Sequence, residues 1–208
     1  MIMGGFAALK TKDLINVGIY SALYFICMGL AEGLTTLVTG LLLPGFTSIF
    51  VPGIVGLLAG PVYMLMCRKV PRFGALTIMG VLMGLFFLIS GHFALAFIPY
   101  VLCGLLADLV ETGLNRGSVH IPWRVLSYLV FTFGSLGPVL PLWFMKNAYV
   151  ASLVKRGKSR DYINALFSHV TAPTLIACLA ITVVGALVGA WIGQRLVSKH
   201  FSEGAAKG

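Results

Sequence analysis

The chain has 208 residues, of which 59% are hydrophobic and only 10% are charged, and its formal net charge is +9. Soluble domains are about half apolar and about a quarter charged, so this composition excludes a soluble globular protein and predicts an integral membrane protein. A membrane span takes roughly 20 helical residues, so this length accommodates about six spans and no soluble ATPase or nucleic-acid-binding module of ordinary size. The basic residues lie in the links between apolar stretches, which indicates cytoplasmic anchoring and no nucleic-acid partner.

Apolar stretches separated by polar links predict a single membrane domain over residues 1–208. Its predicted spans are 14–31, 51–67, 73–90, 93–112, 123–145 and 171–197. The predicted fold class is therefore an all-α integral membrane protein, a bundle of six transmembrane helices. Residues 33–50 are apolar but interrupted by Gly40, Pro44 and Gly45, so this stretch is either a seventh span or a loop that dips into the protein.

The distribution of lysine and arginine favours six spans, because positive residues prefer the cytoplasmic side. With six spans and a cytoplasmic N-terminus, ten of these residues lie inside and five outside; with seven spans the asymmetry disappears. We therefore expect both termini in the cytoplasm and residues 33–50 in a long apolar outer loop. Such a loop is tolerated at membrane depth where it covers a cavity, so it is a candidate lid over an outward-facing pocket.

The other long outer connection is residues 146–170. It is basic from Lys155 to Asp161 and amphipathic from Tyr162 to His169. Two interpretations stay open: a surface helix that lies on the lipid headgroups, or a second lid.

Small residues at four-residue spacing mark faces where membrane helices approach closely. Most of them indicate packing within the bundle: Gly56, Gly60, Gly80, Gly84, Gly185, Gly189 and Gly193. Gly18 and Ala22 form a smooth stripe in the cytoplasmic half of the first span, which could equally receive a helix of another subunit. In the fifth span, glycines and prolines predict a kink near the outer end; they are Gly134, Gly137, Pro138 and Pro141.

A few polar or aromatic residues fall at the predicted outer ends of the helices. They are Glu32, Ser90, His92, Trp143 and Asn147. Small-molecule sites are apolar, aromatic clefts with a few placed polar groups, so these five residues are the candidate substrate-binding set. For each one a simpler interpretation exists, namely a solvated helix end or turn, or an interfacial anchor in the case of Trp143.

At the predicted inner ends, the carboxylates of Asp108 and Glu111 are three residues apart on one helical face. Arg116 and Arg124 follow, so a salt-bridge cluster is favoured over a catalytic carboxylate pair. The four cysteines are isolated and no metal-ligand spacing occurs. The sequence also has no Gly-x-Ser-x-Gly, His-Glu-x-x-His or phosphate-binding glycine loop, so we expect neither an enzyme nor a metal or cofactor site.

Several short motifs resemble one known family. They are the opening Lys-Thr-Lys-Asp-Leu-Ile-Asn, Phe-Gly-Ala-Leu-Thr-Ile-Met-Gly at 73–80, Ser-Gly-His at 90–92, Gly-Leu-Leu-Ala-Asp at 104–108 and Gly-Ala-Leu-Val-Gly-Ala-Trp-Ile-Gly at 185–193. The motifs and their order make the chain, from about residue 10 to 201, similar to the S components of energy-coupling-factor (ECF) transporters. Within them it resembles the MptD, or Trep_Strep, branch.

The resemblance implies a subunit of a bacterial cytoplasmic-membrane importer that captures a vitamin-like micronutrient from outside. Its implied partners are a transmembrane coupling subunit, two cytoplasmic ATPase subunits, the small-molecule substrate and the lipid bilayer. In the family, an Ala-x-x-x-Ala stripe on the first helix contacts the coupling subunit; Gly18 and Ala22 match it, with glycine in place of the first alanine. The alternative is a stand-alone small membrane transporter or a structural membrane subunit.

Overall fold

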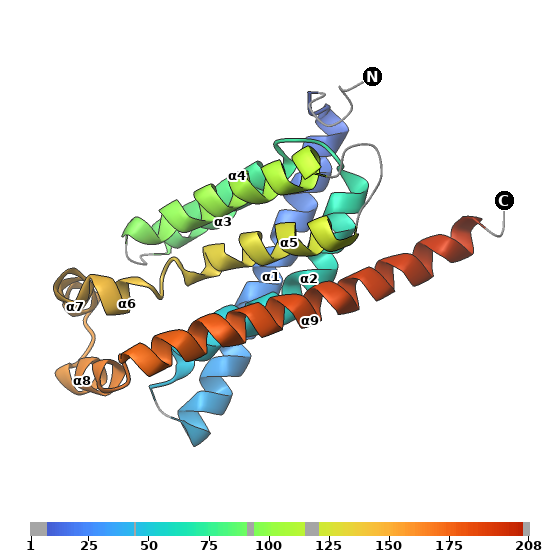
Figure 1. Cartoon of the computed structure of the whole chain (residues 1–208). Helices are drawn as coiled ribbons and strands as arrows, with labels where there is room; N and C mark the ends of the chain where they lie inside the picture. Colours follow the sequence, from blue (N-terminus) through green and yellow to red (C-terminus); the bar gives the residue numbers. More distant parts are fainter. Residues whose placement is uncertain (1–7, 44, 91–93, 115–120, 206–208) are drawn as a thin grey trace.

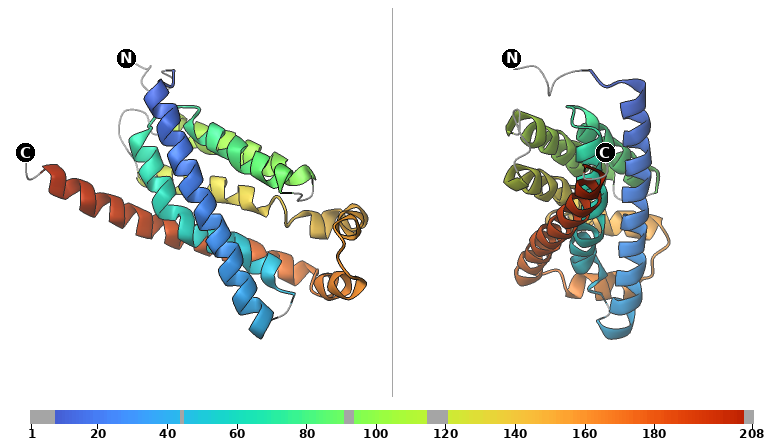
Figure 2. Two further views of the ribbon diagram at one scale, coloured as in Figure 1. Left: turned by 180° about the vertical axis from the view of Figure 1, so that it is seen from behind. Right: turned by 90° about the vertical axis from the view of Figure 1, so that its right-hand side faces the viewer.

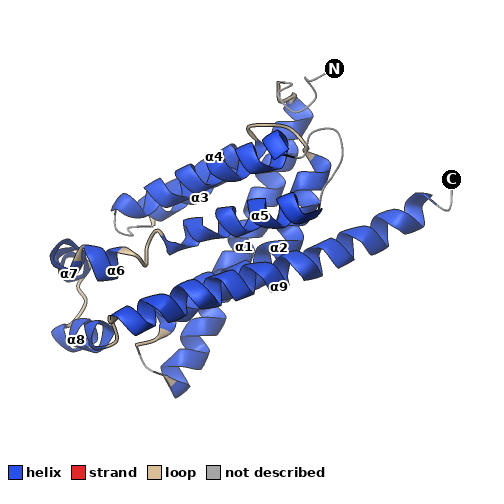
Figure 3. Ribbon diagram, in the orientation of Figure 1, coloured by secondary structure: helices blue, strands red, loops and turns tan. Residues whose placement is uncertain are grey.

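The structure, a computed structural model, describes residues 8–43, 45–90, 94–114 and 121–205. These residues form helices joined by short links, and no strand occurs among them (Figures 1 and 3). The elements are α1 (Thr11–Leu42), α2 (Thr47–Lys69), α3 (Ala75–Ile89), η1 (Ala94–Ala96), α4 (Phe97–Leu114), α5 (Ile121–Thr132), η2 (Phe133–Leu136), α6 (Pro141–Phe144), α7 (Lys146–Lys155), α8 (Arg160–Ser168) and α9 (Ala172–Ala205).

Four helices of the described chain are long and apolar enough to cross a membrane: Thr11–Leu42, Thr47–Lys69, Phe97–Leu114 and Ala172–Lys199. α3 is apolar but has only 15 residues, which corresponds to about 22 Å of helix. α5 has 12 residues and continues through η2 towards α6. The expectation of an all-helical, multi-pass membrane protein is confirmed at this level.

The bundle has two distinct ends. At one end, called the α7–α8 end, the short helices α6, α7 and α8 gather beside the beginning of α9 (Figure 1). The other end is called the α2–α3 end, because α2 connects to α3 there. α1 also begins at this end, and the C-terminal half of α9 packs beside the end of α2. α1 lies along one side of the bundle, packed against α2 and α3 (Figure 2).

α2 is the central helix, and glycines fix its approach to α9. In its most apolar 18-residue window 56% of the residues are buried, against 28% for each of the other three long helices. A Cβ added at Gly60 would collide with the carbonyl group of Gly189, and one at Gly185 with the carbonyl oxygen of Gly53. Any larger residue would separate the two backbones, so the predicted glycine faces are contacts within this chain.

The expectation of a long outer loop over residues 33–50 is wrong. α1 continues as a helix to Leu42 and α2 begins at Thr47, so only a short link separates them. The polar residues of this stretch fit a helix because their hydroxyls bond backward along it: Thr35 Oγ1 donates to Ala31 O (2.6 Å) and Thr39 Oγ1 to Thr35 O (2.7 Å). The turn depends on Gly45, whose φ of +92° favours glycine.

The helix that begins at Ile121 breaks where the glycines and prolines predicted a kink. α5 ends at Thr132 and passes into the 3₁₀ turn η2. Proline has no backbone N–H to continue the helix after this turn. The broken segment lies against α4 and η1, since a Cβ at Gly134 would meet the Tyr100 ring and one at Gly137 the carbonyl oxygen of Ala96.

Candidate functional site

The exposed surface of α1 includes a stripe of small residues, here called the α1 stripe: Gly18, Ala22, Gly29, Gly33 and Gly40. Large apolar side chains of α1, such as Ile26 and Leu30, are exposed beside it. At 3.6 residues per turn the positions of the stripe fall within a sector of about 60°. No atom lies within 4 Å of a Cβ added at any of the four glycines, so nothing in the described chain packs on this face. The opposite face carries the buried residues of the helix, among them Val17, Tyr24 and Met28. Gly18 and Ala22 therefore lie where another subunit could reach them.

Of the five predicted substrate residues, four are described and all four belong to segments at or near the α7–α8 end. Glu32 is exposed on α1, Ser90 is exposed directly after α3, Trp143 is partly buried in α6, and Asn147 is exposed in the first turn of α7. His92 lies outside the described residues. Ser90 Oγ donates to Phe86 O (2.6 Å) and Trp143 Nε1 to Thr171 O (2.8 Å), so these bonds run to backbone carbonyls and do not join the set together.

Residues 146–170 form two short helices across this end of the bundle. Their apolar side chains Leu153, Ile163 and Leu166 are buried in a cluster with residues of η2, α6 and α9, while Lys155 to Asp161 are exposed. The end of α8 also touches the α1–α2 link, where the rings of Phe46 and His169 lie 4.3 Å apart. This segment therefore caps the bundle through its apolar faces.

Glu32, one of the predicted substrate residues, lies near polar side chains of this cap. The pKa of the Tyr149 phenol, in α7, is raised mainly by burial; the charge of Arg156 opposes the rise, and the charge of Glu32 adds to it. Glu32 on α1 thus lies within electrostatic reach of α7. Tyr149 and Arg156 were not singled out from the sequence, since a tyrosine and an arginine in a polar connection carry no specific pattern.

The predicted acidic and basic cluster at the α2–α3 end divides into two separate arrangements. Glu111 and Arg124 form a buried pair, with Glu111 Oε1 at 2.7 Å from Arg124 Nε and 2.6 Å from Arg124 Nη2. Asp108 makes no ion pair among the described residues and instead caps α3: its Oδ2 accepts from Gly74 N (2.8 Å), Thr77 N (2.8 Å) and Thr77 Oγ1 (2.7 Å). Arg116 lies outside the described residues.

A hydroxyl network in the core was missed by the sequence analysis. Tyr63 Oη lies 2.6 Å from Ser127 Oγ, which donates to Ala107 O (2.7 Å), and Tyr128 Oη donates to Gly56 O (2.6 Å). These bonds connect α2, α4 and α5 inside the bundle. The available signal was the tyrosines themselves, because a phenol inside an apolar segment needs a partner when buried.

A pocket of about 230 Å³ opens at the α2–α3 end between α2, α5 and α9. It is lined by Met64, Arg68, Ile121, Arg124, Gln194, Val197 and Ser198. The sequence analysis missed its polar residues on α9. The signal was Gln194 and Ser198, four residues apart and thus on one face of a helix that is otherwise mostly apolar there. In the described part of the chain, no group of three or more histidine, cysteine, aspartate or glutamate side chains could hold a metal ion.

Comparison with known proteins relates the chain to one family. A family model described as a hypothetical bacterial integral membrane protein (Trep_Strep) matches residues 11–203. Neither a curated protein nor a solved structure matches the chain. The match covers nearly the whole sequence, including every helix from α1 to most of α9. The chain is therefore a member of the bacterial integral membrane family Trep_Strep.

Proposed function

We propose that this chain is the substrate-binding S component of an ECF-type importer in the bacterial cytoplasmic membrane. In this role it captures a small molecule from outside and associates with a transmembrane coupling subunit and two cytoplasmic ATPase subunits. It is not itself an enzyme. Two observations support the proposal: the motif resemblance, and the membership of a bacterial integral membrane family.

The observation that carries the proposal is the unoccupied α1 stripe. Lipid tails do not require five small residues in one sector, whereas a helix of another subunit does, because association inside lipid depends on close backbone approach. The stripe runs from Gly18 to Gly40, over about two thirds of α1. Gly18 and Ala22 are the part of it that matches the coupling position of the family.

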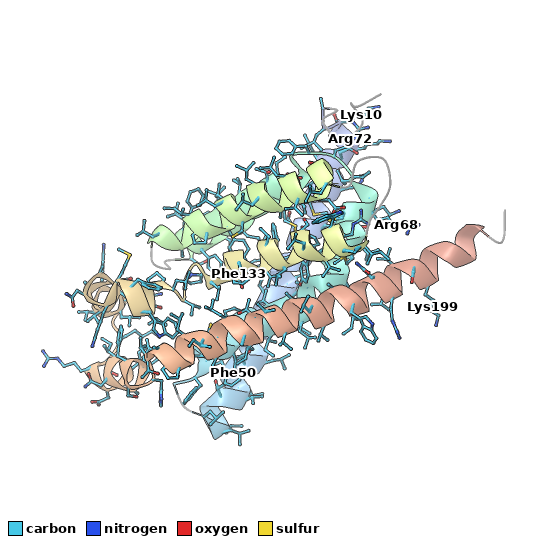
Figure 4. The ribbon with its side chains drawn as sticks, viewed as in Figure 1. Lys10, Phe50, Arg68, Arg72, Phe133 and Lys199 are labelled. Carbon is cyan, nitrogen blue, oxygen red and sulfur yellow. The ribbon has the colours of Figure 1, made fainter. Side chains whose placement is uncertain are left out.

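The proposed topology has six crossings, with α3 and the broken α5–η2–α6 segment as the two shorter ones and both termini in the cytoplasm. Charge supports this orientation. Eight described lysines and arginines belong to the α2–α3 end: Lys10, Lys12, Arg68, Lys69, Arg72, Arg124, Arg195 and Lys199. Figure 4 shows Lys10, Arg68, Arg72 and Lys199 on this end. Five belong to the α7–α8 end, and the end with more positive charge faces the cytoplasm.

In this orientation the α7–α8 end faces outward, and the substrate enters there. Glu32, Ser90, His92, Trp143 and Asn147 remain the predicted contacts, with the α7–α8 segment as the cover in place of the loop first expected over residues 33–50. Removing one buried polar partner of a ligand lowers affinity roughly 5- to 150-fold. We expect such losses for His92→Ala and Glu32→Gln when the substrate, identified from the purified native complex, is titrated by calorimetry.

The test of the proposal is affinity purification of the tagged full-length chain from native membranes, followed by identification of the co-purified proteins. We expect a coupling subunit and ATPase subunits with the parent chain. A Gly18→Leu, Ala22→Leu double variant should lose them, while the same chain keeps its unfolding temperature in detergent. Ala180→Leu is the matched control, because Ala180 is also exposed on a long helix, α9, but lies off the stripe.

The proposal fails if the parent chain is recovered without ATPase subunits and catalyses uptake alone in vesicles. That result would favour the stand-alone transporter. The interface assignment fails separately if the double variant retains its partners as well as Ala180→Leu does.

A further inference from the structure

The α7–α8 end, which faces outward in the proposed topology, carries an excess of positive charge. Five basic residues belong to it: Lys146, Lys155, Arg156, Lys158 and Arg160. Its acidic residues are Glu32 and Asp161, and the links 43–46 and 90–96 contain no lysine, arginine, aspartate or glutamate. Two carboxylates can neutralise at most two of the five cations. An excess of three positive charges, five against two, therefore holds whatever ion pairs form.

Four of these cations lie around the turn between α7 and α8. Lys155 is the last residue of α7 and Arg160 the first of α8. A hydrogen bond from Lys158 N to Leu153 O (3.1 Å) closes the turn, and Gly157 has a φ of +73°. All five basic residues of this end are exposed, and none of them makes an ion pair within the described chain. Their charges are therefore accessible to a ligand.

The cations surround aromatic rings that lie close to a predicted substrate residue. Lys146 Nζ is 5.2 Å from the centroid of the Phe167 ring, and the rings of Phe167 and Tyr149 meet edge to face with their centroids 6.4 Å apart. The charges of Arg156 and Glu32 both act on the Tyr149 phenol. Positive side chains, aromatic rings and a carboxylate thus share one neighbourhood. Such a combination suits a small organic molecule that carries a negative group.

Two arguments favour a ligand from the outer solution over membrane anchoring. Lysine and arginine prefer the cytoplasmic side, so five of them at the outer end weaken the orientation signal, and their mutual repulsion is relieved only by an anion. The apolar side chains of the cap, Leu153, Ile163 and Leu166, are buried in the bundle. A helix that lies on lipid headgroups instead turns its apolar face into the membrane.

We infer that the imported molecule is a small organic anion, attracted to the α7–α8 end by these basic residues. Its carboxylate or phosphate group binds at the α7–α8 turn beside Arg156, and an N–H or O–H group of the same molecule donates to Glu32. This inference rests on the proposed function, because it names the chemical class of the substrate taken up at that end. Opposite charges also speed the encounter in solution, an effect that salt weakens.

The experiment measures stabilisation of the full-length chain, purified in detergent and freed of bound small molecules. The low-molecular-mass part of yeast extract is divided at neutral pH on an anion-exchange resin into a retained fraction of anions and a flow-through of neutral molecules and cations. We expect the retained fraction to raise the unfolding temperature and the flow-through to leave it unchanged, because a ligand stabilises the state that binds it. A flow-through that stabilises the chain, or a retained fraction that does not, overturns the inference.

Charge-neutralising variants locate the anion. Arg156→Gln combined with Lys158→Gln should raise the amount of retained fraction needed for half of the effect by about tenfold or more, since both remove a charged partner of the anion. The matched control, Lys10→Gln with Lys12→Gln, removes two charges from exposed residues at the opposite end, and we expect it to change this amount less than about threefold. Equal losses in the two double variants would overturn the assignment to the α7–α8 turn.

Titration with short-chain phosphatidylglycerol distinguishes a lipid headgroup from a substrate. If this lipid stabilises the parent chain but not the Arg156→Gln, Lys158→Gln variant, while both respond equally to the retained fraction, the cations serve lipid headgroups and the inference is wrong. Co-purification of ATPase subunits is measured separately. A parent chain that keeps these partners but responds to the flow-through contradicts the substrate class alone, and the proposed function stands.

Discussion

At the scale of single residues, three acidic side chains near the α2–α3 end, Asp13, Asp108 and Glu111, each have a specific partner. Asp13 accepts a bond from Lys10 N (2.9 Å) at the start of α1 and lies 3.4 Å from Arg72 Nε, and Asp108 caps α3 from the neighbouring helix. Glu111 and Arg124 are both buried. A buried ion pair of this kind adds little net stability, but removing one member leaves an uncompensated charge in an apolar environment.

This argument predicts a non-additive pair of substitutions. Arg124→Met should destabilise the chain by roughly 3–5 kcal/mol, while Glu111→Leu, Arg124→Met should recover most of that loss because both charges are gone. The measurement is reversible unfolding in mixed micelles. A double variant as unstable as the single one would contradict the assignment of a buried pair.

At the scale of helices, backbone contact between glycines determines how α2 and α9 pack. Gly56 and Gly60 on α2 and Gly189 and Gly193 on α9 leave no space for a side chain. The glycines of the α1 stripe are different, because their surroundings are open. The same residue type at the same spacing therefore marks an internal contact on two helices and an exposed face on a third.

The contrast predicts opposite results for one chemical change. Gly60→Ala should destabilise the isolated chain by about 1–3 kcal/mol, because the methyl group collides with the carbonyl group of Gly189. Gly29→Ala should cause no loss, since nothing lies within 4 Å of the added Cβ and alanine favours a helix. Unfolding in detergent measures both variants, and equal destabilisation would contradict the packing of α1 described here.

At the scale of the whole molecule, the two ends of the bundle differ in structure and charge. The α7–α8 end carries a cap of two short helices, and the α2–α3 end carries most of the basic residues and the pocket. A membrane protein with this asymmetry has one preferred orientation.

We predict that Lys69 and Lys158 lie on opposite sides of the membrane. In a chain whose four native cysteines are replaced, Lys158→Cys should react with a membrane-impermeant maleimide added to intact cells. Lys69→Cys should react only after the membrane is opened. Labelling of both cysteines from the same side would overturn the six-crossing topology.

The sequence by itself determined the class of the protein. In lipid, the backbone N–H and C=O groups of apolar stretches of this length find their hydrogen-bond partners within helices. The sequence also indicated that the glycine faces of α2 and α9 pack within the bundle and that the helix beginning at Ile121 bends near its glycines and prolines, since glycine spacing and proline act locally.

Only the tertiary structure decided how the apolar residues 33–50 divide between two helices. A run of threonine, glycine and leucine suits either a loop or a helix. Here Thr35 and Thr39 are buried in the bundle, and Thr39 Oγ1 lies 2.6 Å from Thr47 Oγ1 in the first turn of α2. The structure also separated Asp108 from Glu111 and joined Arg68, Arg124 and Gln194 in one pocket. These residues belong to different helices, and their meeting depends on crossing positions that no local pattern encodes.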